Sequence, residues 1–209
     1  NAPGRYSYPD VGPLVVPGIY QVEMYLVDNG ETKKLSTSPQ FTVKALENSS
    51  LDQQTIASIE FKKEVAELRR QVFGANEQVN NFDKRLKYVK AAIANFPNTD
   101  LAWMKEVSAI EKQIQAVEFA MWGKSYLSKR DVETLPGLGS RIETMVYQMW
   151  YSTSDPTTTH KEQYAIAKEE FQAIKPKVEK IKADLLVLEE KLNAKGIPYT
   201  PNRIDFREE

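Results

Sequence analysis

The chain has 209 residues, with 28 Lys and Arg against 29 Asp and Glu, so its formal net charge is −1. This balance argues against a nucleic-acid binder, which normally carries a basic excess. The absence of Cys excludes disulfide frameworks, thiolate metal sites and cysteine nucleophiles. With His160 as the single histidine we expect no metal site and no cofactor. No apolar run approaches the roughly 18 residues that a membrane-spanning helix needs, so we also expect no membrane span.

Residues 1–47 are predicted to form a β segment, the first of two domains. Apolar and other side chains alternate between Val22 and Val27, which is the pattern of a strand. Asp28-Asn29-Gly30 then favours a tight hairpin turn, and a partner strand with an interruption is expected over residues 32–43. Two or three strands are too few to be stable alone. We therefore expect this segment to pack on the rest of the chain, or to be the end of a larger β-sandwich.

Residues 48–209 are predicted to form the second domain, a helical bundle with an extended tail. Apolar residues step by three and four positions, which is the heptad pattern of packed or coiled-coil helices. These seams cover residues 65–93, 103–121 and 164–192. Pro156 is expected at the first position of the last helix, and Gly196 is expected to cap its end.

A shorter helix is predicted over residues 140–151, and together with the second long helix it nearly matches the first in length. The fold class is therefore mainly α: a long antiparallel three-helix bundle with a broken middle helix, preceded by a small β-hairpin or partial β-sandwich. Gly74 and Pro176 fall near the level of the break. We expect the 124–139 loop to bulge there, with Gly74 making room for it and Pro176 kinking the last helix.

Acidic side chains between the seam positions raise the question of paired catalytic carboxylates. The residues concerned are Glu60, Glu64, Glu67, Glu169, Glu170, Glu189 and Glu190. We interpret them as solvated helix faces, because charged residues are normally at the surface. His160, at the start of the last helix, has only Asp155 and Glu162 near it in sequence and is interpreted as exposed. We therefore predict no catalytic residue and no metal ligand here.

Five aromatic residues flank the predicted break and form the candidate ligand-binding site. They are Trp122, Tyr126, Tyr147, Trp150 and Tyr151. An exposed Trp and Tyr cluster can stack against sugar rings or anchor a partner protein. The alternative, which we favour, is that these rings fill the gap left by the broken helix.

A family resemblance begins at residues 16–22, where Val-Pro-Gly-Ile-Tyr-Gln-Val resembles the Pro-Gly-x-Tyr-x-Val strand of bacterial immunoglobulin-like modules. A hairpin, a final strand at Phe41-Thr42-Val43 and a long helix follow. Leu135-Pro136-Gly137-Leu138 and Pro156-Thr157 come next in order. This order resembles the C-terminal region of large secreted bacterial proteins with sortilin-type or sialidase-type β-propeller repeats, which are often labelled glycosyl hydrolases.

The resemblance implies a non-catalytic accessory or structural-interaction region of such a glycosyl-hydrolase-like protein, secreted, periplasmic or at the cell surface. Its implied partner is the upstream β-propeller of the same protein, with a glycan or another protein as further candidates. Any catalytic residues would lie upstream, so this region is not expected to be an enzyme. The alternative is a carbohydrate-binding or carbohydrate-hydrolysing domain that uses the aromatic cluster. A third reading is a coiled-coil oligomer, because the same seams also suit pairing between chains.

Overall fold

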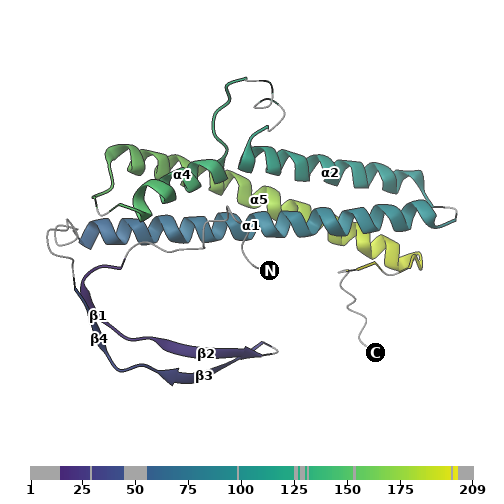
Figure 1. The fold of residues 1–209 in the computed structure, drawn as a ribbon. Helices are drawn as coiled ribbons and strands as arrows, with labels where there is room; N and C mark the ends of the chain where they lie inside the picture. Colours follow the sequence, from purple (N-terminus) through teal and green to yellow (C-terminus); the bar gives the residue numbers. More distant parts are fainter. Residues whose placement is uncertain are drawn as a thin grey trace. The chain divides into compact units, whose positions relative to one another are not determined.

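The structure is a computed structural model in which the chain forms two compact units. The first unit consists of Asn1–Ala66 and Val146–Thr158, and the second of Glu67–Met145 and Thr159–Glu209. It describes residues 15–28, 30–44, 56–97, 99–124, 127, 130, 132–152, 154–198 and 200–201. Among these, the helices are α1 (Ile56–Asn95), α2 (Leu101–Trp122), α4 (Leu138–Trp150) and α5 (Thr158–Ala194) (Figure 1). The fold is mainly α with a preceding β segment, as predicted.

The β segment is one bent antiparallel hairpin in the first unit. Its strands are β1 (Gly18–Tyr20), β2 (Glu23–Asp28), β3 (Glu31–Thr37) and β4 (Phe41–Val43), with β1 paired to β4 and β2 to β3 (Figure 1). Gly30 has a φ of 85°, a value that glycine adopts without strain in a tight turn. The predicted hairpin is confirmed, although Asn29 lies outside the described residues.

The hairpin has no core of its own. Every side chain of β2 and β3 is exposed, whichever face of the ribbon it occupies. Ile19 on β1 is 71% exposed and Val27 on β2 is 69% exposed. A two-stranded ribbon of this kind is marginal in water, because it buries too little apolar surface.

The second unit is a three-helix bundle, and ion pairs between helices fix the direction of each. Lys90 of α1 contacts Glu111 of α2 at 2.7 Å, and Asn76 further back on α1 accepts from Trp122 further along α2. Rising numbers on one helix thus match falling numbers on the other, so α1 and α2 are antiparallel.

The last helix returns alongside the other two in the same unit. Gln113 of α2 donates to Asp184 of α5 at 2.7 Å, and Lys191 bonds Glu106 at 2.8 Å. Helix α5 is therefore antiparallel to α2 and parallel to α1. The up-down-up order matches the predicted antiparallel three-helix bundle.

The middle helix is broken, and the two ends of the intervening loop meet. α2 ends at Trp122 and is capped by Gly123, whose φ is 75°. A Cβ built on Gly137 would lie 2.7 Å from both the Gly123 nitrogen and the Met121 carbonyl oxygen. The chain then resumes as α4 in the direction of α2, and Glu143 meets Arg69 of α1 at 2.8 Å. Figure 1 shows α2 and the beginning of α4 end to end.

The predicted seams supply the core of the bundle, because almost all of their members are buried. The largest fully buried side chains in the second unit include Leu86, Ile93, Met121, Leu138, Ile142, Ile181, Leu185, Leu188 and Leu192. Gly196 ends the last seam with a φ of 72°, and the Ile197 N–H donates to the Leu192 carbonyl at 3.0 Å. The predicted C-cap is confirmed.

Two local predictions were wrong. A Cβ on Gly74 would meet nothing within 4 Å, so Gly74 makes no room for the loop. Helix α5 begins at Thr158, so Pro156 precedes the helix instead of opening it. Pro176 lies inside α5 as expected, and the helix continues through it to Ala194.

Glu189 was also misassigned as part of a solvated face. It is 3% exposed, and its carboxylate is held by Arg85 of α1, with Nη2 to Oε2 at 2.6 Å and Nε to Oε1 at 3.3 Å. Such a two-pronged contact offsets the loss of water around both charges. The ion pair therefore fixes the register between α1 and α5.

We expect Glu189→Ala to lower the free energy of unfolding by about 3–5 kcal/mol, because it leaves the Arg85 charge buried and unpaired. The matched control is Asp83→Ala on α1. It removes a more exposed ion pair with Lys87 one turn further along α1, in which Lys87 is 71% and Asp83 32% exposed. Urea unfolding followed by helical circular dichroism measures both variants. Equal losses in the two variants would contradict the buried role.

Candidate functional site

Trp122, the first candidate residue, closes the break in the middle helix. Its Nε1 donates to Asn76 Oδ1 at 2.8 Å, and its ring meets Phe73 edge-on with centroids 5.6 Å apart. Gly139 lies against the ring, where a Cβ would come within 2.4 Å of it. Trp122 is 40% exposed, yet these contacts account for its position as a packing residue.

The candidates on α4 and directly after it belong to the first unit and differ from one another in burial. Trp150 is only 6% exposed and lies in the core. Tyr147 and Tyr151, one turn apart, are 60% and 57% exposed, with ring centroids 5.6 Å apart and planes tilted by 54°. Tyr126 lies outside the described residues. Of the five candidates, the structure thus brings Tyr147 and Tyr151 together as an exposed pair.

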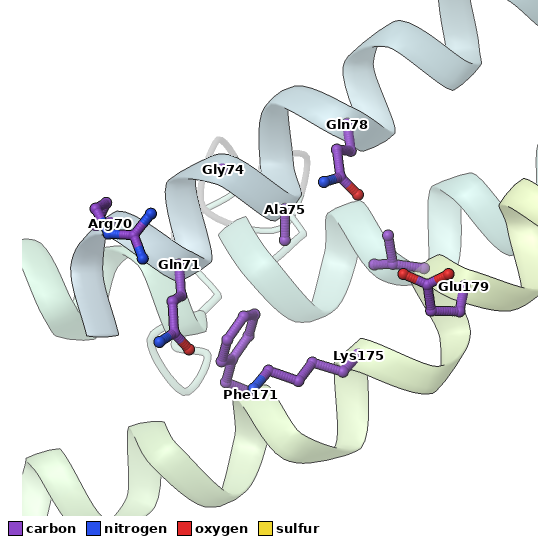
Figure 2. Close-up of a pocket in the computed structure, with 9 residues that line it drawn as sticks. Arg70, Gln71, Gly74, Ala75, Gln78, Phe171, Lys175 and Glu179 are labelled. Carbon is purple, nitrogen blue, oxygen red and sulfur yellow. The ribbon is translucent and has the colours of Figure 1, made fainter. Parts of the chain in front are cut away.

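A groove between α1 and α5 was not predicted from the sequence. It has a volume of about 410 Å³ and lies in the second unit (Figure 2). Its lining is Arg70, Gln71, Gly74, Ala75, Gln78, Phe171, Lys175, Val178 and Glu179. The one feature of the sequence that could have indicated this groove is Gly74, because a glycine on α1 leaves space beside the larger side chains around it.

Two of the three charged residues that line this groove, Arg70 and Lys175, have partners on their own helices. The Glu67 carboxylate accepts from Arg70 Nε at 2.8 Å and Nη2 at 2.6 Å, and from Gln71 Nε2 at 2.7 Å. These bonds, with Arg70 as the stronger partner, lower the pKa of Glu67 to about 2. Lys175 Nζ lies 4.7 Å from the centroid of the Phe171 ring. A carboxyl whose pKa is lowered in this way is ionised near neutral pH, where it has no proton to donate as a general acid.

Burial is the main cause of a pKa shift at two of the described groups, Lys62 and His160. In the first unit, Lys62 is 5% exposed and donates to the Ser152 carbonyl at 3.1 Å. Burial lowers the pKa of its amine, and the charge of Asp155 opposes that shift. In the second unit, His160 is half-buried, not exposed as expected, and burial lowers its pKa. Lys62 anchors the connection between α4 and α5, because its ammonium holds a backbone carbonyl there.

The described residues contain no group of three or more His, Asp or Glu side chains that could hold a metal ion. In the same part of the chain, no helix is long and apolar enough to cross a membrane. Comparison with protein-family models finds no match, and no curated protein or solved structure matches the chain either.

We expect Gly139→Ala to destabilise the bundle by about 1–3 kcal/mol, because the new methyl group displaces the Trp122 ring. Gly74→Ala is the matched control, since it adds the same methyl to a helix at a position where nothing lies within 4 Å. That variant should gain up to about 1 kcal/mol from helix propensity. Urea unfolding followed by tryptophan fluorescence distinguishes the two. Wild-type stability in Gly139→Ala would refute the packing role of Trp122.

Proposed function

We propose that the chain is a non-catalytic accessory region of a larger secreted protein. In this role the bundle is a rigid spacer and the hairpin docks on a neighbouring β-domain. The observation that carries the proposal is the exposed apolar surface of the hairpin. Its apolar members, 44–71% exposed, are Ile19, Val22, Met24, Tyr25, Leu26, Val27, Leu35 and Phe41. Contiguous exposed apolar surface is typical of interaction sites.

The spacer role is supported by the packing and the ion pairs within the bundle. Its seams are buried against one another, and an ion pair joins each two of the three long helices α1, α2 and α5. The buried pair between Arg85 and Glu189 resists sliding of α5 along α1, because any shift would leave two charges unpaired. A fixed register keeps the two ends of the second unit at a constant separation.

The non-catalytic part of the proposal is supported by the groove in Figure 2. An active site needs a concave pocket in which titratable groups converge on one point. Beside this groove, Glu67 is bound to Arg70 and Gln71, and Lys175 lies over Phe171. These arrangements suit the stability of the helix surfaces better than proton transfer.

The resemblance supplies the wider context of the proposal. It suggests that the neighbouring β-domain belongs to a secreted β-propeller protein of the glycosyl-hydrolase-like type, with any catalytic residues outside this chain. In that context the hairpin is the last part of an immunoglobulin-like sandwich.

The proposal predicts that the native gene product is secreted and considerably larger than this chain. An antibody raised against the bundle should detect, in culture medium with protease inhibitors, a species well above 23.8 kDa. Pulse-chase labelling separates the first product from later fragments. A first product of 23.8 kDa, or one confined to the cytoplasm, would overturn the proposal.

A second candidate function, glycan binding, is favoured by the exposed pair of Tyr147 and Tyr151. Neighbouring aromatic rings that are more than half exposed can stack against sugar rings. This candidate predicts binding on a glycan array that either Tyr147→Ala or Tyr151→Ala abolishes. Tyr88→Ala, which removes a tyrosine of α1 that is 48% exposed, is the control and should bind normally. Absence of binding by the wild-type chain would reject this candidate.

A further inference from the structure

The outer edge of β2 presents backbone groups that no described strand pairs with, because β2 pairs there with β3 alone. The Val22 carbonyl accepts from the Ser38 N–H at 2.8 Å, so the backbone of Val22 faces the opposite arm. Backbone direction alternates along a strand. Leu26 therefore faces β3, while Tyr25 and Val27 direct their N–H and C=O groups outward.

The register of the hairpin supports this assignment independently. Asp28 lies opposite Glu31 across a two-residue turn, and Val27 lies opposite Thr32. The pair that closes a two-residue turn exchanges hydrogen bonds, so the next pair is turned outward on both strands. Val27 and Thr32 thus point their backbone N–H groups to opposite edges of the same ribbon.

The two edges differ in their protection against a further strand. β3 carries Lys33 and Lys34, and lysines on an edge discourage pairing. The register shifts between Met24 and Tyr25, which leaves Leu35 of β3 without an opposite residue. Such a bulge twists an edge strand away from flat pairing. Neither device occurs on β2, whose sequence is Glu-Met-Tyr-Leu-Val-Asp.

We propose that the outer edge of β2 accepts an extended strand from the neighbouring β-domain of the same protein. This rests on the proposed function and adds to it the edge, the strand and the mode of contact. The incoming strand pairs with the outward backbone groups of Tyr25 and Val27. Its side chains lie beside Tyr25 and Val27 on one face of the sheet and beside Met24 and Leu26 on the other.

Charge favours a different chain segment over a second copy of β2. Glu23 and Asp28 lie at the two ends of β2, and Glu31 faces Asp28 across the turn. Two β2 strands side by side would bring these carboxylates together, and like charges on neighbouring strands are destabilising. Lys34 already neutralises Glu23 at 2.5 Å, so basic residues are expected opposite Asp28.

The test uses two proline substitutions in the full-length product of the native gene. Val27→Pro removes an outward N–H from the β2 edge, and Thr32→Pro removes the matching N–H from the β3 edge. Because both groups point away from the ladder, the two variants disturb the hairpin to the same extent. Hydrogen exchange resolved to single amides, and limited proteolysis of the hairpin, are measured on the wild type and both variants.

In the wild type we expect the Tyr25 and Val27 amides to exchange at least about tenfold more slowly than those of Thr32 and Lys34. Val27→Pro should remove the protection of Tyr25 and make the hairpin protease-sensitive, while Thr32→Pro should retain both. Equal exchange at the two edges, or loss of protection only in Thr32→Pro, would overturn the inference about the β2 edge. The proposal of a larger secreted protein would not be affected by that result. A first gene product of 23.8 kDa would instead overturn the proposed function beneath it. If instead the isolated chain forms dimers and Val27→Pro dissociates them, the β2 edge pairs with a second copy of this chain and the inference is wrong about the partner.

Discussion

Mutual burial of three heptad seams is the constraint on which the second unit depends. Each long helix carries one apolar stripe, and a stripe can leave water only against another stripe. Three stripes within one chain cover each other, so the up-down-up order follows from helix lengths and short connections. The buried pair of Arg85 and Glu189 then selects one register from those that the apolar residues alone would permit.

The break in the middle helix is compatible with this core because its two ends meet. Gly123 and Gly137 allow the backbones to touch, and Gly139 leaves a flat space that the Trp122 ring fills. Asn76 satisfies the indole N–H at the same place. The buried seam therefore continues from α2 into α4. Among the described residues of the loop between them, 127, 130 and 132–136, none is buried.

The hairpin shows the opposite condition, a folded element with no core of its own. Its apolar residues are exposed. The β3 edge carries two lysines and a bulge, and the β2 edge carries neither. An element of this kind depends on a neighbour for its stability. The self-contained bundle and the dependent hairpin are the two features on which the proposed accessory role rests.

The sequence by itself determined the elements, because periodicity, turn residues and caps act over a few residues. The steps of three and four, the turn at Gly30 and the cap at Gly196 each act locally. Only the tertiary structure decided which polar residues are buried and which aromatic residues meet. Glu189 could not be recognised as buried without Arg85, which lies 104 positions away. Trp150 and Tyr151 are sequence neighbours, yet Trp150 is in the core and Tyr151 is 57% exposed, because α4 and its buried seam end at Trp150.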